Sequence, residues 1–185
     1  MSRSFFILIV LLIISSTISK AQTGDKYKLM KDEKSGRQML IGQINREALS
    51  DTSFSWWFNS EYDNYTVKSK ELDSSVKENI RDYDITIVLG TWCSDSRREI
   101  PRFLKILDSL GFDSGKVKLL AVDREKKGLV VETDCLKIEI VPTIIFYKDG
   151  KEAGRITEAP VETLETDTNN IITSKCKIDS GKEKS

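Results

Sequence analysis

The pattern of apolar positions predicts a mixed α/β domain in the second half of the chain. Unbroken apolar stretches from residue 85 to 89 and from 117 to 122 predict two buried strands. Between them, apolar residues recur with the helical period from Ile100 to Leu110. Gly111 follows directly, as expected at the end of a helix. The first part of the domain is therefore predicted to be a strand, a helix and a strand.

The remaining pattern predicts a second helix, a hairpin and a final helix. Residues 129–138 are expected to form a short helix, and 143–147 a third strand. Asp149-Gly150 predicts a tight turn into a fourth strand at 152–157. Pro160 is expected to open the last helix, with an inward face of Val161, Leu164, Ile171 and Ile172. The order βαβαββα predicts a three-layer sandwich, because β-α-β units pair in parallel and place helices on the sheet faces.

An N-terminal extension, residues 22–79, precedes this domain and is predicted to be a polar leader followed by helices. Residues 22–40 are polar and predict a flexible leader or a poorly packed edge. Asn45 can cap a short helix. Leu72, Val76 and Ile80 recur as one apolar helix stripe. The aromatic cluster of Phe54, Trp56, Trp57 and Phe58 is expected to pack the extension onto the domain, and an exposed binding patch is the other interpretation.

Residues 1–21 predict a cleaved secretory signal peptide. Arg3 supplies a positive charge, residues 5–14 are all apolar, and Ser19 to Ala21 offers small residues where a signal peptidase cleaves. The apolar stretch is too short to span a bilayer as a helix, which needs about 20 residues. An uncleaved anchor or a buried strand are the alternatives. We therefore expect export to the periplasm or the extracellular space, with no membrane-spanning segment after cleavage.

Composition and charge narrow the chemistry. The chain has 29 Lys and Arg against 29 Asp and Glu, which disfavours a nucleic-acid partner. It has no histidine, so histidine-based triads, dyads and metal sites are excluded. Its three cysteines, Cys93, Cys135 and Cys176, lack the C-x-x-C spacing typical of zinc sites. We predict no metal and no cofactor.

Cys93 lies between the end of the first predicted strand and the start of a helix. The free N–H groups and the dipole of a helix N-terminus stabilise a thiolate, so this position favours a reactive cysteine without a histidine. An inert buried cysteine is the alternative. The residue is therefore the strongest candidate nucleophile in the chain.

Between residues 80 and 176 four features occur together: Trp92-Cys93, Pro101, Val141-Pro142-Thr143 and Gly150. With them the sequence resembles the thioredoxin superfamily, and within it an exported thioredoxin-like group of bacterial type. Trp92-Cys93 matches the opening of the family's active site, and Pro101 matches the proline in its active-site helix. Val141-Pro142-Thr143 matches the loop whose proline is cis and faces the catalytic cysteine, and Gly150 matches a glycine of the last hairpin. The resemblance implies a thioredoxin-like fold with an N-terminal helical extension, and a polar tail at 177–185.

The resemblance also implies site roles. Cys93 would be the nucleophile and Ser96 would stabilise its thiolate. Trp92 would shield the sulfur, while Val141, Pro142 and Thr143 would hold the substrate.

The sequence departs from the thioredoxin pattern at two positions. Ser96 stands where the family has its second, resolving cysteine, giving a Cys-x-x-Ser site, and Ile87 stands where it has a buried acid. Asp95 opposes a thiolate while Arg97 and Arg98 favour one, and the sequence does not rank these effects.

The sequence thus predicts a monothiol-type thiol–disulfide oxidoreductase or isomerase. It would form mixed disulfides with protein or small-molecule thiols and disulfides through Cys93. A redox-inactive peptide-binding or chaperone module is the alternative. Cys135 is expected to lie too far from Cys93 to resolve the mixed disulfide, and Cys176 to lie at the end of the last helix.

Overall fold

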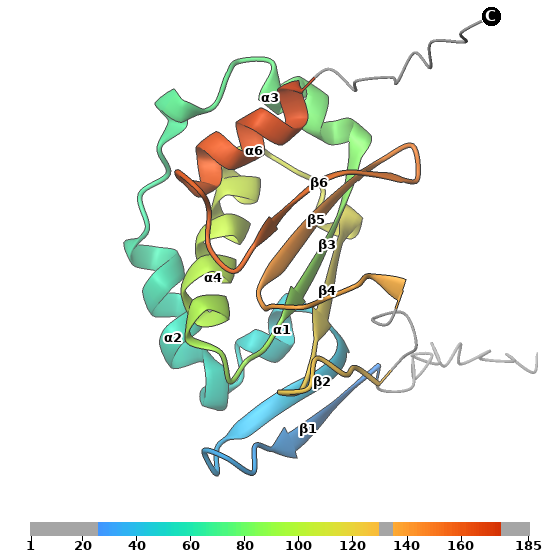
Figure 1. The fold of residues 1–185 in the computed structure, drawn as a ribbon. Helices are drawn as coiled ribbons and strands as arrows, with labels where there is room; N and C mark the ends of the chain where they lie inside the picture. The colour runs from blue at the N-terminus through green and yellow to red at the C-terminus, as the bar shows by residue number, and fades with distance from the viewer. Residues whose placement is uncertain (1–25, 130–134, 175–185) are drawn as a thin grey trace, which may run out of the picture.

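Six strands form one mixed sheet in the part of the chain that the computed structural model describes, residues 26–129 and 135–174 (Figure 1). Their order across the sheet is β1-β2-β4-β3-β5-β6. The strands are β1 (Tyr27–Lys31), β2 (Gln38–Ile44), β3 (Tyr83–Leu89), β4 (Val117–Ala121), β5 (Thr143–Lys148) and β6 (Lys151–Thr157). The β3–β4 pair is parallel, whereas β1–β2, β2–β4, β3–β5 and β5–β6 are antiparallel.

The register of the central strands determines where the candidate site lies. Val88 of β3 pairs with Thr143 of β5, and Leu89 pairs with Ala121 of β4. The segment that leaves β3 and the segment that enters β5 therefore meet at one end of the sheet. That end holds both Cys93 and Pro142.

The helix after β3 follows the sequence prediction. Helix α4 runs Ser94–Ser109, with Gly111 just beyond it at a φ of 66°. Its apolar face is buried: Ile100, Phe103, Leu104, Ile106 and Leu107. A left-handed residue after the last turn favours glycine, which explains why the helix ends there.

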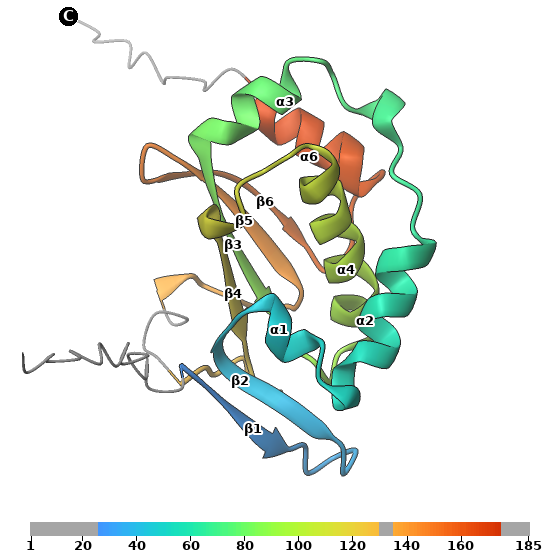
Figure 2. The ribbon, with the colours of Figure 1, turned by 180° about the vertical axis from the view of Figure 1, so that it is seen from behind.

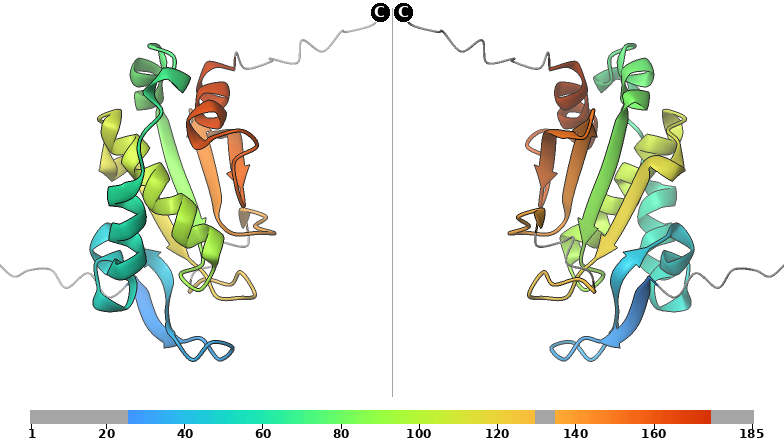
Figure 3. Two further views of the ribbon diagram at one scale, coloured as in Figure 1. Left: turned by 90° about the vertical axis from the view of Figure 1, so that its left-hand side faces the viewer. Right: turned by 90° about the vertical axis from the view of Figure 1, so that its right-hand side faces the viewer.

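The other described helices are short, except for α2 and α6. They are α1 (Arg46–Leu49), α2 (Thr52–Asn64), α3 (Val76–Asn79) and α6 (Leu164–Thr173), with 3-10 turns η1 (Ser69–Glu71), η2 (Ile80–Asp82) and η3 (Ser114–Lys116). Helix α2 lies beside α4, as Figure 2 shows from behind. In the left panel of Figure 3 these two helices lie in front of the strands, and in the right panel the strands lie in front.

The two faces of the sheet carry cores of different size. Ile85, Ile87 and Leu89 of β3 belong to the large core shared with α1, α2, α4 and α6. Val88 points to the other face, where it joins Leu120, Val122 and Val141. Trp92, Cys93, Leu136 and Ile138 pack against this smaller core. Alternation along β3 thus turns Val88 toward the smaller core, and Cys93 packs against that core beyond the end of the strand.

Three elements differ from the sequence prediction. Residues 27–44 form the hairpin β1–β2 and not a flexible leader followed by a helix, because β2 pairs with β4 and buries Met39 to Ile41. The exposed edge strand β1 agrees with the other interpretation of this segment, a poorly packed edge. The predicted stripe of Leu72, Val76 and Ile80 is not on one helix, because Leu72 follows η1, Val76 begins α3 and Ile80 begins η2. Helix α6 begins at Leu164, capped by Thr163, and Val161 before it is 93% exposed. The predicted inward position of Val161 is therefore wrong.

Other predictions are confirmed. Asn45 caps α1 by accepting a hydrogen bond from the Ala48 amide. Asp149 and Gly150, both at positive φ, turn β5 into β6. Phe54, Trp57 and Phe58 pack in the large core, although Trp56 is 60% exposed.

Some predictions fall outside the described residues. They concern the signal peptide at 1–21, residues 130–134 of the helix predicted at 129–138, Cys176 and the tail at 177–185. Within the described part, no helix is long and apolar enough to cross a membrane. From β3 to α6 the described elements follow the expected order, apart from the helix predicted between β4 and β5, which falls partly outside the described residues. The thioredoxin-like α/β class is confirmed by the six-strand sheet and its flanking helices.

Candidate redox site around Cys93

Cys93 stands immediately before the first turn of α4. Its amide donates to the carbonyl of Gly90 (2.8 Å), and its own carbonyl accepts from the Arg97 amide (3.1 Å), the first bond of the helix. The side chain is partly exposed and does not cap the helix. The sulfur is thus held at a helix N-terminus, where unpaired N–H groups favour an anion.

The loop before β5 faces this sulfur. The Val141–Pro142 peptide bond is cis, as the resemblance implies. The Cys93 thiol donates to the Val141 carbonyl, with 3.3 Å between Sγ and O. The Pro142 carbonyl accepts from the Glu158 amide (2.7 Å), which fixes the loop to the end of β6. The predicted Cys93, Val141 and Pro142 are therefore brought together.

Thr143 braces this loop from inside. It is 1% exposed, and its hydroxyl donates to the carbonyl of Ile140 (2.7 Å). A side chain in this position holds the loop in shape. Its predicted contact with substrate stays a prediction.

The indole of Trp92, the neighbour of Cys93, is held against the segment that follows β4. Its indole N–H donates to the Val122 carbonyl (2.9 Å). A Cβ atom at Gly90 would be only 2.6 Å from the indole, so Gly90 is the residue that permits this close approach. Trp92 and Cys93 both pack against the smaller core, and the predicted shielding of the sulfur by Trp92 stays a prediction.

Ser96 is buried one turn into α4, and its oxygen has a backbone partner. Its Oγ accepts from the amide of Gly90 (3.1 Å), joining α4 to the segment after β3. A hydroxyl can accept and donate at once, so the predicted donation to a Cys93 thiolate stays a prediction. What the structure adds is a bracing contact that the sequence did not predict.

The charged side chains that follow Cys93 in α4 make contacts in two different directions. Arg98 pairs with Asp95 (2.9 Å) and with the buried Glu99 (2.5 Å). Arg97 turns the other way, and its Nε donates to the carbonyl of Thr91 (2.7 Å). Asp95 is thus partly neutralised by Arg98, whereas Arg97 stays with the segment that carries Cys93.

A second arginine, Arg124, follows the end of β4 and reaches the site. The sequence alone did not identify it. Arg124 stacks on Trp92, with its guanidinium 4.7 Å from the ring centre. Nε and NH2 of Arg124 donate to the two carboxylate oxygens of Asp32 (2.8 Å each). Hydrogen bonds from Arg124, and then from Ser35, lower the pKa of Asp32 far below its usual range. Because Asp32 and Arg124 are far apart in sequence, no local pattern could have paired them.

Two further positions complete the comparison with the predicted site. Ile87, at the position of the family's buried acid, is fully buried in the large core. Cys135 is an exposed free thiol. Within the described ranges, no cluster of carboxylates and cysteines is arranged to hold a metal ion.

One pocket of about 270 Å³ lies elsewhere, between α2, α4 and the segment before α6. Glu99, Arg102, Tyr65 and Thr163 are among its lining residues. Cys93 and Pro142 do not line it. This pocket is therefore separate from the partly exposed Cys93 sulfur.

Comparison with known proteins gives distant structural likeness alone. No protein-family model and no curated protein matches the chain. A Pseudomonas aeruginosa protein of unknown function is 15% identical over 64% of this chain and 81% of its own, with a TM-score of 0.42. Fasciola hepatica thioredoxin is 23% identical over 44% and 73% of the two chains (TM-score 0.32). Arabidopsis thaliana thioredoxin O2 is 24% identical over 54% and 73% (TM-score 0.31). The assignment of this chain to a thioredoxin-like fold rests on its own topology and its cis-proline loop.

Proposed function

We propose that this protein is a thiol–disulfide oxidoreductase or isomerase of monothiol type, with Cys93 as its nucleophile. One observation carries the proposal. The partly exposed Cys93 sulfur lies at the N-terminus of α4 and 3.3 Å from the Val141 carbonyl, beside cis-Pro142. A thiol in that position can ionise and can meet an extended substrate.

The first chemical step is attack by the Cys93 thiolate on one sulfur of a substrate disulfide. A bond forms between Cys93 and that sulfur, the substrate S–S bond breaks, and the second substrate sulfur leaves as a thiolate. The protein is then joined to its substrate as a mixed disulfide. The leaving thiolate takes a proton from solvent.

The second step needs a thiol from outside the site, because Ser96 supplies none. If a thiol of the substrate attacks the substrate sulfur of the mixed disulfide, Cys93 leaves and the substrate has exchanged one disulfide for another, which is isomerisation. If an external thiol attacks there, it becomes disulfide-bonded to the substrate and Cys93 is again released. Attack by an external thiol on the Cys93 sulfur instead frees the substrate and leaves that thiol bound to Cys93, so a further thiol is needed. Buried Ser96 braces α4 through Gly90 and is proposed to support the thiolate.

A second candidate function is peptide binding without redox chemistry. Strand β5 begins at Thr143, two residues after Val141. Within the described residues, the backbone of Val141 forms no hydrogen bond with another strand of the sheet. Such a segment can pair with an extended peptide by strand addition. This binding would persist if Cys93 did not react.

We further propose that the protein acts outside the cytoplasm. The support is the signal-like segment at 1–21, with its short apolar stretch and small residues before the cleavage point. Disulfides persist in such compartments, so substrates for Cys93 would be present there.

Trapping of mixed disulfides tests the function. Reduced protein is mixed with a disulfide-linked peptide, quenched with acid and analysed by mass spectrometry without reductant. We expect the wild type to accumulate a long-lived peptide adduct. Ser96→Cys should release the peptide as its introduced thiol attacks the Cys93 sulfur and closes an internal disulfide.

Two controls make this result decisive. Cys93→Ala should form no adduct at the site, whereas Cys135→Ser should behave as the wild type. If the wild type forms no adduct but still binds the reduced peptide, the binding module is the correct function. If Ser96→Cys forms the adduct and does not release it, the geometry of the site excludes dithiol chemistry.

A further inference from the structure

Cys93 has an uneven distribution of charge around it. Arg97 lies one helical turn after Cys93 and is half-buried, held by its bond to the Thr91 carbonyl (2.7 Å). That bond uses Nε alone and leaves the two terminal nitrogens of the guanidinium. Among the described residues Arg97 forms no ion pair, so its charge is not neutralised by a bonded carboxylate.

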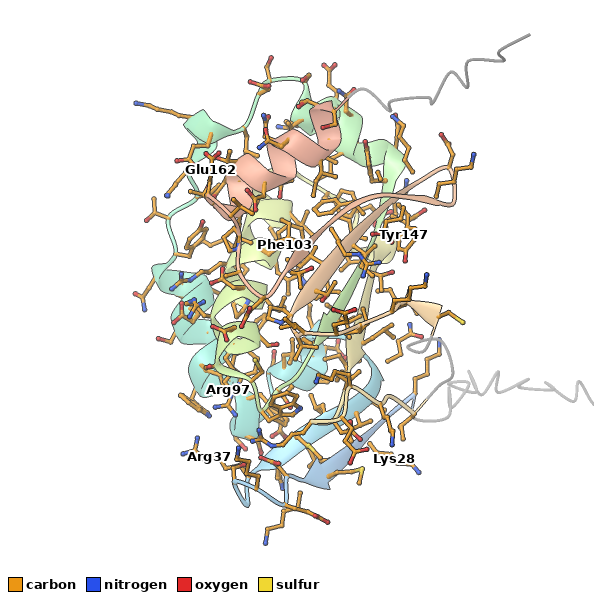
Figure 4. The ribbon with its side chains drawn as sticks, viewed as in Figure 1. Lys28, Arg37, Arg97, Phe103, Tyr147 and Glu162 are labelled. Carbon is orange, nitrogen blue, oxygen red and sulfur yellow. The ribbon has the colours of Figure 1, made fainter. Side chains whose placement is uncertain are left out.

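Two further arginines lie on the same side. Arg124 stacks on Trp92, next to Cys93. Arg37 lies in the loop between β1 and β2, and Figure 4 shows it and Arg97 at the same end of the molecule. Burial, and then the charge of Arg37, lower the pKa of Arg97, while a thiolate at Cys93 acts in the opposite direction. The charges of Arg37 and Arg124 therefore both act on the guanidinium of Arg97.

Among the described residues, Asp32 is the carboxylate seen to pair with one of these three arginines. Asp32 forms a bidentate salt bridge with Arg124 and so offsets the charge of that arginine. The charges of Arg97 and Arg37 are not offset by this pair. Asp95 and Glu99 lie on the other side of the helix start, where both pair with Arg98. Arg97 and Arg124 thus bring positive charge to Thr91 and Trp92, the two residues directly before Cys93.

The environment of Arg97 suits a bound carboxylate. Its guanidinium lies 5.8 Å from the ring centre of Trp56, which is 60% exposed and limits the directions from which water reaches it. Arginine binds carboxylates through paired N–H groups, and partial burial strengthens such a bond. Charges of one sign beside a reactive group also raise the encounter rate with ligands of the other sign.

We propose that the thiols and disulfides on which Cys93 acts carry a carboxylate near the sulfur, and that Arg97, reinforced by Arg37, binds it. This proposal rests on the proposed function, because it names the substrate class of the same site. The carboxylate belongs to a small thiol or to an acidic residue beside a cysteine in a peptide. Arg97 is then a specificity-determining residue, and the bonds made and broken at Cys93 are unchanged.

The test compares exchange rates with two small disulfides. Dithiobis(nitrobenzoate) carries carboxylates and dithiodipyridine carries none, and each releases one thiol as Cys93 forms a mixed disulfide. Rates are measured at low salt and at a pH where Cys93 is fully ionised. We expect Arg97→Gln to lower the ratio of the anionic to the neutral rate by about fivefold or more. Raising the salt concentration should reduce the ratio for the wild type.

Two variants control for charge and position. Arg97→Lys keeps the charge and should retain at least about half of the wild-type ratio. Arg46→Gln removes an arginine that pairs with Asp108 near the end of α4, about 22 Å along the helix from Cys93, and should leave the ratio unchanged. A peptide disulfide with Glu beside its cysteine, compared with the Gln peptide, distinguishes a protein segment from a small thiol as the source of the carboxylate.

The outcomes separate the two proposals. If the wild type reacts with neither disulfide, the proposed function fails. If it reacts with both and Arg97→Gln leaves the ratio unchanged, the function stands and the carboxylate preference is wrong. If Arg97→Gln slows both reactions equally, Arg97 acts on the thiolate alone, and the preference is likewise wrong.

Discussion

Ser96 shows at the scale of one residue how the site departs from a dithiol enzyme without losing its shape. The amide of Gly90 is buried and needs an acceptor, which the Ser96 oxygen supplies at 3.1 Å. Gly90 in turn permits the close approach of Trp92. The sequence predicted a chemical role for Ser96, and the structure adds a mechanical one.

Removing the Ser96 hydroxyl should therefore reduce stability. In Ser96→Ala the Gly90 amide is left buried without its partner, which costs about 1–3 kcal/mol. Urea unfolding followed by circular dichroism measures the change. Ser94→Ala is the matched control, because Ser94 is exposed at the start of the same helix and should change stability little. An equal effect of the two substitutions would contradict the bracing role.

At the scale of elements, the β1–β2 hairpin is the main addition to what the sequence predicts. The loop between its strands supplies Asp32, which is 2% exposed and accepts two hydrogen bonds from the guanidinium of Arg124. Arg124 in turn covers Trp92. The hairpin therefore reaches the redox site through two charged side chains and is part of its wall.

This link should depend on pH. Hydrogen bonds from Arg124 and then Ser35 keep the pKa of Asp32 below its usual value of about 3.9. As pH falls below about 4, the unfolded chain takes up the proton before the folded protein does, so this stabilisation declines. It is fully present at neutral pH.

Comparison with Asp32→Asn measures the effect. We expect the variant to have a lower urea midpoint than the wild type at pH 7, and the difference to shrink as the pH approaches 2. Tryptophan fluorescence should report the loosening, since Trp92 lies beneath Arg124. A difference that stays constant across this range would exclude a contribution from the Asp32 carboxylate.

The hairpin also shows where sequence patterns stop being informative. The helix after Cys93 and the strands β3 to β6 have strong local periodicity, so their places could be predicted. Strand β1 is mostly exposed and charged, and β2 is identified only by its pairing with β4, which lies far along the chain. The predicted inward position of Val161 was wrong because Thr163, and not Pro160, caps α6.

At the scale of the whole molecule, the extension is fastened to the domain at two ends. Near the redox site it is held by Asp32 and Arg124. At the other end, the fully buried Glu165 of α6 accepts from the hydroxyl of Tyr65 (2.8 and 2.9 Å) and the amide of Lys68 (2.9 Å). Burial, and then the hydrogen bond to Glu165, raise the pKa of Tyr65. The extension is thus integrated into the fold, which the aromatic cluster predicted only in part.

The order of the strands in the whole sheet explains which parts of the site could be predicted from the sequence. Cys93, Trp92 and Pro142 follow from motifs whose spacing is local, and the sheet register brings them together. Arg124 and Asp32 have no local signature, because their pairing depends on how the β1–β2 hairpin lies against the end of β4. A site assembled from distant segments is visible only once the sheet order is known.

The most direct test of the central claim uses the cysteines of one molecule against each other. Folded, reduced protein is exposed briefly to a peptide disulfide at neutral pH, and the adducts are assigned by peptide mapping. Cys93 is expected to react at least about tenfold faster than Cys135, because a helix N-terminus favours the thiolate and an exposed surface position does not. In denatured protein the advantage should disappear. Equal rates in the folded protein, or faster reaction at Cys135, would contradict the assignment of Cys93 as the nucleophile.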